Sequence, residues 1–437
     1  MISVSVAPAS KRPSSALSLW SWAFFDWANS PYTTLIITFV FSTYFTKAVA
    51  QDESQLWGVT QIISSILIVA LSPIFGAIAD VMGNRKPWLA GFTAMCVIGS
   101  GMLWFAVPTQ SAVAAAMFWV IISNIGFEFG ATFNSAMLPD IVPDDKVGRW
   151  SGWAWGLGYA GGLVAMAIAY LGFVAPEHPL FGISHEQMAN VRVVGPICAI
   201  WFVLFSWPLF VFVPDKPSTG VKIGTAIKGG FGNLLTTFKH VGQYKNVARF
   251  MLARMFYNDA LTTIFIFGGT YAAQQFNMPI SKVLLFGGVL NITAGIGAAS
   301  FAFLDDKLGS RKTIMISLVG LIVTAGAAVV VTDADYFMAA GAVLGIFVGP
   351  AQAASRTMLA RLAPPELATE FFGLFAFTGK AISFIGPLMF TTLTAIFHSQ
   401  RAGMCGVAVF LIAGLIMMFT VKEPARLLPA AMFENAG

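Results

Sequence analysis

The stretch Asp80-Val-Met-Gly-Asn-Arg-Lys86 returns in altered form as Asp306-Lys-Leu-Gly-Ser-Arg-Lys312. The acid, the glycine and the basic pair keep their spacing, and the second copy begins 226 positions after the first (306 − 80). Each copy lies between two long apolar runs, as a short charged loop between two membrane spans does. The chain is therefore a doubled unit in which each half repeats the same order of segments.

Composition places this doubled unit in a membrane. Of the 437 residues, 57% are hydrophobic and only 10% are charged, whereas a soluble domain carries about 25% charged residues. The net charge of +5 does not indicate a nucleic-acid partner, because the basic residues are spread over short loops instead of one patch. Cys96, Cys198 and Cys405 lie far apart in apolar runs, so neither a disulfide framework nor a metal site is expected.

Twelve apolar segments are long enough to cross a bilayer, and each must be a helix because lipid offers the backbone no other partner. They cover roughly residues 22–47, 57–79, 87–107, 111–136, 151–174, 192–213, 248–273, 282–304, 313–332, 336–359, 371–395 and 403–421. The predicted fold class is an all-α integral membrane protein with twelve transmembrane helices in two pseudo-symmetric six-helix bundles. The bundles comprise residues 22–213 and 248–421, and tails of residues 1–21 and 422–437 flank them.

The distribution of basic residues predicts the orientation. Residues 1–18 contain Lys11 and Arg12 and lack an apolar core, so no cleavable signal peptide is predicted. If the chain starts inside, 19 of its 25 Lys and Arg residues fall on the cytoplasmic side and four fall in outer loops. We therefore expect a multi-pass protein with both termini in the cytoplasm, in the cell (inner) membrane if the chain is bacterial.

Residues 214–247 form the longest polar stretch and separate the bundles. One helical stripe of this stretch is apolar, with three lysines off it: Ile227, Phe231, Leu234, Phe238 and Val241, then Lys228, Lys239 and Lys245. We expect an amphipathic helix on the cytoplasmic membrane surface, with its basic side towards anionic headgroups. The alternative is a plain linker.

Other pairs extend the repeat into the spans. Asn29, Thr33 and Thr34 match Asn258, Thr262 and Thr263, while Pro143, Gly152 and Gly158 match Pro364, Gly373 and Gly379. Because each half contains six spans, the halves are parallel repeats and not inverted ones. This arrangement, with an Asp-x-x-Gly-x-Arg-Lys loop after the second span of each half, resembles the major facilitator superfamily over essentially the whole chain. The resemblance implies a carrier that works by alternating access.

Shorter motifs carry a narrower resemblance. They are Phe25-Asp-Trp-Ala-Asn-Ser30, Tyr257-Asn-Asp-Ala260, Ser355-Arg356, Ala360-Arg-Leu362 and Phe371-Phe-Gly-Leu374. Together they resemble the vacuole-effluxer family, which includes the fungal autophagy-linked amino acid effluxers and bacterial members. The resemblance implies amino acid efflux as the best-known activity of such a carrier, and it leaves the substrate of this chain open.

The repeated loop is suited to a gate. Gly76 and Gly83 allow close backbone approach, while Asp80 can lie near a helix N-terminus and near Arg85, locking the cytoplasmic ends of the helices. The alternative is a basic turn that only fixes topology. Ala302 stands where Gly76 stands in the first copy, which weakens the case for an equal role of the second loop. The gating candidates are Gly76, Asp80, Gly83, Arg85, Asp306, Gly309 and Arg311.

Five ionisable residues fall within spans: Asp26, Glu128, Arg254, Asp259 and Lys380. A charge at mid-membrane costs at least about 2.5–3.5 kcal/mol, so such groups face a wet cavity or each other. In the superfamily arrangement, spans one, four, seven and ten line the central cavity and span eleven borders it. Acids and cations in one cavity suit a zwitterion. The substrate-binding candidates are Asp26, Asn29, Tyr32, Arg254, Asn258, Asp259, Gln352 and Lys380.

Each charged candidate has a second interpretation. Asp26 lies about one turn inside the membrane, so an interfacial helix cap competes with a cavity role. Glu128, between two phenylalanines, is the proton-coupling candidate, and an ion pair with a basic residue such as Arg254 is its alternative. Lys380 is expected to pair with an acid, for instance Asp259, in a structural or a binding role.

The glycines of the fifth span, from Gly152 to Gly162, predict close helix packing; they resemble the glycine-rich motif of superfamily antiporters but lack its proline. No Walker motif, nucleophile elbow or dinucleotide fingerprint occurs, so neither an enzyme nor a cofactor is expected. We expect a monomeric secondary transporter in the bilayer that exports amino acids or similar small polar metabolites, with protons as candidate coupling ions. A proton-driven multidrug exporter and a transporter-like ligand sensor are the alternatives.

Overall fold

The computed structural model describes residues 15–51, 53–239 and 244–423, and these are helical with short connections. The first half contains α1 (Ala16–Pro31), η1 (Tyr32–Phe39), α2 (Phe41–Tyr44), η2 (Phe45–Val49), α3 (Ser54–Met82), α4 (Lys86–Met102), η3 (Leu103–Phe105), η4 (Gln110–Ala112), α5 (Val113–Ile141), η5 (Asp144–Lys146), α6 (Val147–Ala169), η6 (Tyr170–Val174), η7 (Leu180–Gly182), η8 (Glu186–Met188), α7 (Ala189–Arg192) and α8 (Val194–Phe212). Helix α9 (Ile223–Lys239) follows. The second half contains α10 (Lys245–Gln275), α11 (Ile280–Leu308), α12 (Ser310–Val330), α13 (Ala334–Leu362), η10 (Pro365–Leu367), α14 (Ala368–Ala381), α15 (Ile385–Phe397) and α16 (Gln400–Met418).

The predicted fold class is confirmed, and each predicted span falls on a helical segment. Ten helices in the described part of the chain are long and apolar enough to cross a membrane. The first span of each half is not among these ten. The first consists of α1, η1, α2 and η2 and carries polar residues such as Asp26, Asn29 and Thr33. The seventh, α10, is 31 residues long but carries polar residues such as Arg254, Asn258 and Asp259. Both belong to the four spans that are expected to line the cavity.

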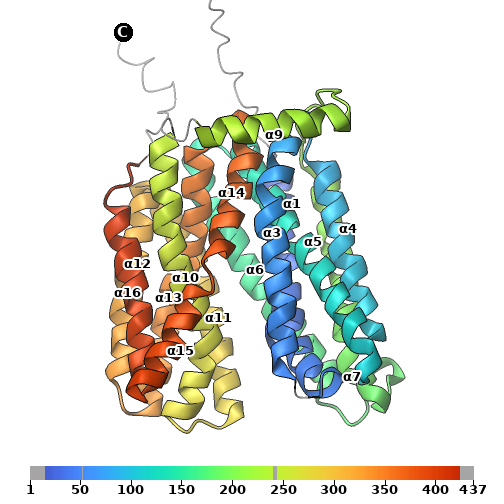
Figure 1. Cartoon of the computed structure of the whole chain (residues 1–437), viewed down its shortest axis with the longest axis vertical. Coiled ribbons are helices and arrows are strands. Elements are labelled where there is room, and N and C mark those ends of the chain that lie inside the picture. Colours follow the sequence, from blue (N-terminus) through green and yellow to red (C-terminus); the bar gives the residue numbers. More distant parts are fainter. Residues whose placement is uncertain (1–14, 52, 240–243, 424–437) are drawn as a thin grey trace, which may run out of the picture.

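Span eleven is broken in the middle. Helix α14 ends at Ala381 and α15 begins at Ile385, and the two ribbons are visibly offset in Figure 1. Pro387 favours the break, because inside a continuous helix it would lack an N–H and clash with the carbonyl four residues earlier, although α3, α5 and α13 each continue through a proline. Pro387 is the third residue of α15, where the missing N–H destabilises the helix little, since the first four N–H groups of a helix have no intrahelical partner.

The halves meet at two equivalent helix crossings, α3 with α14 and α6 with α11. A Cβ added at Gly373 would lie 2.5 Å from the carbonyl oxygen of Ser72, and one added at Gly152 would lie 2.5 Å from that of Ala298. Glycine is therefore required at both crossings. Figure 1 shows the halves meeting at the end of the molecule where α9 lies, the α9 end, and lying farther apart at the opposite end.

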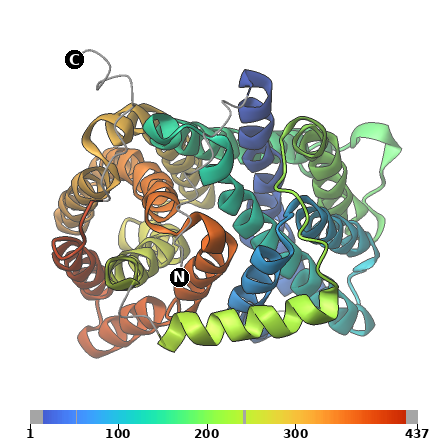
Figure 2. The same ribbon diagram turned by 90° about the horizontal axis from the view of Figure 1, so that it is seen from above.

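Helix α9 lies along one edge of the molecule and passes beside α3 (Figure 2). A Cβ on Gly230 would lie 2.9 Å from the backbone nitrogen of Ile78, so the two helices are in close contact. The preceding segment is tied to the end of α3, because the Thr219 N–H donates to the Met82 carbonyl over 2.9 Å. The helix predicted between the bundles is thus present, while Val241 of its predicted stripe lies outside the described residues.

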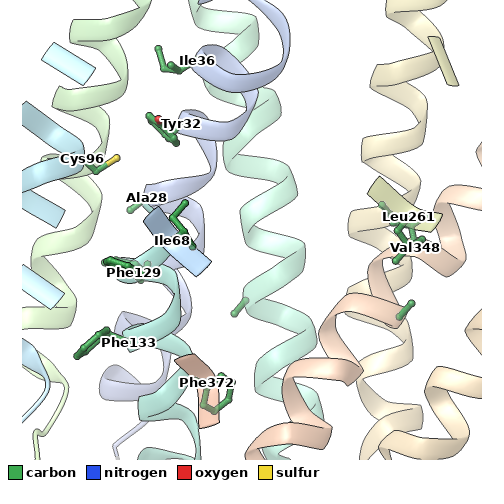
Figure 3. Close-up of a cluster of buried hydrophobic side chains, with 14 of the residues drawn as sticks. Ala28, Tyr32, Ile36, Ile68, Cys96, Phe129, Phe133, Leu261, Val348 and Phe372 are labelled. Carbon is green, nitrogen blue, oxygen red and sulfur yellow. The ribbon is translucent and has the colours of Figure 1, made fainter. Parts of the chain in front are cut away.

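A hydrophobic core fills the first half and continues into the second. Figure 3 shows Tyr32, Cys96, Phe129 and Phe133 packed together in the first half, with Leu261 on the facing helices of the second. Phe129 and Phe133 are each 1% exposed, and Phe129 lies edge-on to Phe92 with ring centroids 5.0 Å apart. This packing holds α5, and with it Glu128, in a fixed orientation.

Candidate transport site

Asp80 of the first loop contacts the opposite half through backbone groups. Its Oδ1 accepts the Thr369 N–H over 3.1 Å and its Oδ2 accepts the Glu370 N–H over 2.7 Å. Both donors belong to the first turn of α14, where unpaired N–H groups and the helix dipole favour a negative charge. The carboxylate therefore joins the end of α3 to the start of span eleven.

Arg85 extends this contact and is 2% exposed. Its Nε donates to Thr369 Oγ1 over 2.7 Å, its Nη1 donates to the Ala136 carbonyl over 2.8 Å and to the Asp140 carboxylate, and its Nη2 lies 3.5 Å from Asp80 Oδ1. A buried guanidinium needs several acceptors to offset its desolvation, and here it has them. We call the Asp80–Arg85–Thr369 group the first latch.

We call the Asp306–Arg149 group the second latch, because it repeats the backbone contact of the first. Asp306 Oδ1 accepts the Arg149 N–H at the start of α6 over 3.1 Å, and Arg149 matches Glu370 at the offset of 221 that relates the two halves here (370 − 149). The arginine beside the acids comes from a different element, however. Arg361 Nη1 lies 2.8 Å from Asp305 Oδ1 and its Nη2 lies 3.6 Å from Asp306 Oδ1.

Arg311 does not take the place of Arg85 in the second latch. It donates to the carbonyls of Met418 and Phe419 at the end of α16, inside its own half. The charges have exchanged places instead. In the first half the loop provides the arginine and the end of α5 provides Asp140; in the second half Asp305 of α11 provides the acid, and Arg361, at the position equivalent to Asp140, provides the arginine.

Two glycines of the repeated loops end their helices with positive φ angles, 84° at Gly83 and 94° at Gly309. Space is also limited there. A Cβ at Gly83 would lie 2.6 Å from the Pro217 carbonyl, and one at Gly309 would lie 2.7 Å from the Glu423 carboxylate. Gly76 faces the Thr369 carbonyl, which a Cβ would approach to 2.4 Å. All three positions therefore require glycine.

Asp26 pairs with a residue of the other half. Its Oδ2 lies 2.7 Å from Arg356 Nη1, and its Oδ1 accepts from Asn134 Nδ2 over 3.3 Å. Arg356 also donates to the Ser151 hydroxyl and carbonyl over 3.0 and 2.8 Å. The pair thus joins α1 and α6 to α13, and Asp26 does not act as a helix cap at the membrane surface.

Lys380 pairs with an acid as expected, but the acid is Glu128 and not Asp259. Glu128 likewise pairs with a basic residue, which is Lys380 and not Arg254. Lys380 Nζ lies 2.7 Å from Glu128 Oε1, which bridges α14 and α5 across the seam between the halves. The side chains are 32% and 21% exposed, so both retain contact with open space. The sequence showed which spans carry the charges, but not which way each helix turns them.

Arg254 instead lies against Phe375. Its guanidinium carbon is 3.4 Å from the centre of the ring, and its Nη1 donates to the Phe375 carbonyl over 2.8 Å. One turn further along α10, Asn258 Nδ2 donates to the Gly379 carbonyl over 3.3 Å. Both contacts hold α14 immediately before its broken end. In the described chain Arg254 has no acidic partner.

Asp259 is almost completely buried, at 1% exposure. Its Oδ2 accepts the Gly386 N–H at the start of α15 over 2.7 Å. Its Oδ1 has no hydrogen-bond partner among the described residues. Asp259 therefore sits at the broken point of span eleven, beside the segment that carries Lys380.

The neutral candidates divide into two groups. Gln352 lies in the seam, where its Oε1 accepts the Tyr159 hydroxyl of the opposite half over 2.6 Å. Tyr32 is fully buried in the first half, with its hydroxyl 2.9 Å from Ser123 Oγ, and Asn29 is 6% exposed. Tyr32 is therefore a core residue here and not part of the seam.

These contacts form a ladder from the α9 end to mid-depth. In the described chain, the hydrogen bonds and ion pairs between the halves run from the two latches through Asp26–Arg356 to Tyr159–Gln352 and Glu128–Lys380. Glu128 is the 16th of the 29 residues of α5, so the last rung lies near the middle of the membrane. Beyond it, towards the opposite end, the Phe39 ring lies near Gly287, where an added Cβ would be 3.8 Å from it.

Sequence reasoning missed several of these residues. Arg356 was seen only as part of a motif, and Asp215 and Glu423 were not singled out. Asp215 accepts the N–H groups of Arg85 and Lys86 over 3.0 and 2.9 Å, and Glu423 accepts those of Ser310 and Arg311 over 3.0 and 2.7 Å. The two acids cap equivalent helices, α4 and α12. Each follows a valine by two positions, and this repeated pattern was the available signal.

Solved structures of major facilitator superfamily proteins share this fold. The human organic anion transporter MFSD10 has a TM-score of 0.74 at 12% identity, covering 93% of this chain and 100% of that one. The proton:xylose symporter XylE bound to 6-bromo-6-deoxy-D-glucose has a TM-score of 0.71 at 14% identity, covering 93% and 96%. A bacterial homologue of the iron transporter ferroportin in outward-facing state has a TM-score of 0.67 at 14% identity, covering 93% and 97%. The fold is that of a major facilitator superfamily transporter, a class of non-enzymatic carriers.

The family is also shown by sequence. The profile described as "MFS/sugar transport protein" matches residues 14–149, and the one described as "Vacuole effluxer Atg22 like" matches residues 144–426. The chain belongs to the Atg22-like vacuole effluxer family. It is 27% identical to the MFS-type transporter YxiO of Bacillus subtilis over 414 residues, which cover 92% of this chain and 94% of that protein. It is 23% identical to autophagy-related protein 22 of Yarrowia lipolytica over 337 residues, which cover 69% of this chain and 55% of that longer protein.

Proposed function

We propose that this membrane transporter carries small zwitterions, most directly amino acids, and exports them with the help of a proton gradient. The observation that carries the proposal is the Glu128–Lys380 pair, in which an acid and a base from opposite halves lie 2.7 Å apart and partly exposed. An amino acid offers the same two charges. Its ammonium can replace Lys380 beside Glu128, and its carboxylate can replace Glu128 beside Lys380.

Exchange of this kind would couple binding to movement. The pair is a direct link between the halves, so a substrate that separates it removes one rung of the ladder. Arg254, which has no acid partner in the described chain, adds a second cation for the substrate carboxylate. Asn258 and Gln352 add neutral hydrogen bonds on neighbouring helices. The binding energy would then favour one arrangement of the halves over another, as alternating access requires.

The latches are proposed to act as the gate. Asp80 and Asp306 hold the α9 end closed by accepting N–H groups from the other half. With the basic loops and α9 on the cytoplasmic side, this is a state closed to the cytoplasm. Export is supported by the description of the family as vacuole effluxers. The fungal relative from Yarrowia lipolytica is named an autophagy-related protein, which describes that protein.

Substrate counterflow in proteoliposomes tests the proposal. Vesicles loaded with one unlabelled amino acid are given a trace of the same labelled compound, across a panel of neutral, acidic and basic amino acids. Wild-type protein should accumulate label for at least one of them. Analogues that lack the carboxylate or the ammonium should compete about 10- to 100-fold less well, because each removes one charged hydrogen bond.

Variants locate the site. Lys380→Met and Glu128→Gln should each raise the half-saturating concentration, whereas Lys282→Met, an exposed lysine at the start of α11, serves as the matched control and should not. Transport of apolar cations without any amino acid would favour a multidrug exporter instead. Tight amino acid binding without counterflow would favour a sensor.

A further inference from the structure

Asp259 differs from the other acids inside the spans. Asp26 and Glu128 each face a cation, at 2.7 Å in both cases. Asp259 has no ion-pair partner in the described part of the chain, although it is 1% exposed. One of its oxygens accepts the Gly386 N–H, and the other, Oδ1, has no hydrogen-bond partner there. It is the 15th residue of the 31-residue helix α10, which places it near mid-membrane.

No nearby charge compensates for this carboxyl group. Around α10 pack α11, α13, α14, α15 and α16. Their ionisable side chains near this level are engaged elsewhere: Lys380 with Glu128, Arg356 with Asp26, and on α10 itself Arg254 with Phe375 and Tyr257 with Ser355. Helix α15 contains no ionisable residue, and Cys405 of α16 is exposed. The others lie towards the helix ends: Lys245, Arg249, Tyr271, Lys282, Asp305, Asp306, Lys307, Asp335, Tyr336, Arg361, Glu370 and Arg401.

Such a carboxyl group is stable in its neutral form. A buried ion without a partner costs far more than a buried polar group, so a group of this kind neutralises by taking up a proton. The N-terminus of α15 and the Gly386 N–H favour a negative charge, but they offset only part of the desolvation. The charged form becomes acceptable once water or a cation reaches Oδ1.

A proton fits this place better than a metal ion. Sodium and larger cations need several oxygen ligands. Two carbonyls at the break already accept hydrogen bonds, that of Lys380 from the N–H and hydroxyl of Ser383 and that of Ile382 from the Ile385 N–H. Thr263 donates its hydroxyl proton to the backbone carbonyl of Asp259. A proton needs only one oxygen, and Oδ1 is available.

We infer that Asp259 binds and releases the coupling proton, and that the break in span eleven links this proton to the Glu128–Lys380 pair. Lys380 precedes the break and Gly386 follows it. A substrate that draws Lys380 away from Glu128 shifts the end of α14, and with it the N–H that faces Asp259. The inference rests on the proposed function, and it names the group that senses the gradient.

Two measurements test it. The first is infrared spectroscopy of reconstituted protein between acidic and alkaline pH, which follows the carbonyl band of protonated carboxyl groups and needs no substrate. We expect a component of this band that is present in the wild type to be missing in Asp259→Asn and to remain in the control Thr263→Val. Asparagine keeps an oxygen for the Gly386 N–H, and Asp259→Ser serves as the second variant if Asp259→Asn does not fold.

The second measurement is transport. Asp259→Asn should lose the stimulation by a pH gradient by at least about tenfold, while counterflow without a gradient stays within a few-fold of the wild type. Glu128→Gln should retain the stimulation at saturating substrate. An infrared band unchanged in Asp259→Asn overturns the inference whatever the substrate proves to be. Gradient stimulation that survives in Asp259→Asn, or stimulation by sodium in place of protons, overturns it as well. Absence of counterflow in the wild type speaks only against the proposed substrate class.

Discussion

At the scale of single residues, the charges inside the spans fall into three kinds. Asp26 and Arg356 form a buried pair with further hydrogen bonds, which is a structural joint between the halves. Glu128 and Lys380 form a more exposed pair, which a polar ligand can enter. Asp259 stands without a counter-charge among the described residues. The exposure and the partners of each group, more than its charge, decide whether it joins the halves, meets a ligand or takes up a proton.

A double-mutant cycle on Glu128 and Lys380 should show strong coupling. Removing one partner leaves a charge in a place of low dielectric constant, which for a fully buried pair costs about 3–5 kcal/mol. The side chain of Glu128 is 21% exposed and that of Lys380 is 32% exposed, so we expect about 1–2 kcal/mol for each single change. The double variant Glu128→Gln with Lys380→Met should be close to the wild type. Thermal unfolding in detergent gives the coupling energy.

The same cycle on Glu128 and Lys282, the exposed lysine at the start of α11, is the matched control and should be additive, because the two groups do not pair. Additive losses for Glu128 and Lys380 would show that the 2.7 Å contact does not contribute to stability.

At the scale of elements, the ends of α3 and α14 are joined by one carboxylate that accepts two backbone N–H groups. Asp80→Asn weakens both bonds, and hydrogen bonds to charged groups contribute about 1.5–3 kcal/mol each. The variant should shift the protein towards states open at the α9 end and reduce turnover at least about tenfold, while substrate affinity changes little. Equilibrium binding and counterflow, measured side by side, separate the two effects.

Asp215→Asn is the control for Asp80→Asn, because Asp215 caps α4 within one half. It should reduce stability without favouring either arrangement of the halves. Equal loss of binding and transport in a folded Asp80→Asn protein would contradict the gating role.

The helix crossings predict a steric block. Gly373→Ala places a methyl group 2.5 Å from the Ser72 carbonyl, and overpacking of this kind costs about 1–3 kcal/mol. Because the contact exists only when the α9 end is closed, the variant should populate states open at that end. Gly152→Ala should do the same at the other crossing. Gly326→Ala in α12, with nothing within 4 Å of the new Cβ, should leave transport unchanged. Labelling of single cysteines near the latches reports the opening.

How far the sequence determined these elements can be judged from span eleven. Its length and hydrophobicity predicted one helix over residues 371–395, and the fold class was correct, yet the helix breaks after Ala381. Pro387 signalled a break, but a window average does not register it. The predicted partner of Lys380 failed for another reason. Hydropathy fixes the span that holds a residue, while the rotation of that helix depends on packing such as that of Phe129 and Phe133 in α5.

At the scale of the whole molecule, the polar contacts between the described parts of the halves lie between the α9 end and mid-depth. Alternating access requires the two ends to change in opposite directions. Spin labels at exposed positions test this, one pair at the opposite end (Thr109→Cys with Asp335→Cys) and one pair at the α9 end (Asp145→Cys with Lys307→Cys), in a background with Cys405→Ser.

Added amino acid should shorten the distances at the opposite end and lengthen those at the α9 end. Asp80→Asn should lengthen the α9-end distances without ligand. Distances that increase or decrease together at both ends would indicate that the whole bundle expands or contracts, and they would contradict a rocking motion.

The exchanged charges of the latches bear on how such a duplicated protein evolves. Asp80 and Asp306 are held by peptide N–H groups, which every residue except proline supplies. Substitutions at positions 149, 369 and 370 therefore leave these N–H donors in place, although they change the side-chain contacts that Thr369 makes with Arg85 and Arg149 makes with Asp306. The arginine also occupies different positions in the two halves. It is Arg85 on the loop in the first half and Arg361 at the end of α13 in the second. A statistical search for correlated substitutions between the halves would register the side-chain contacts of this junction and pass over its backbone hydrogen bonds.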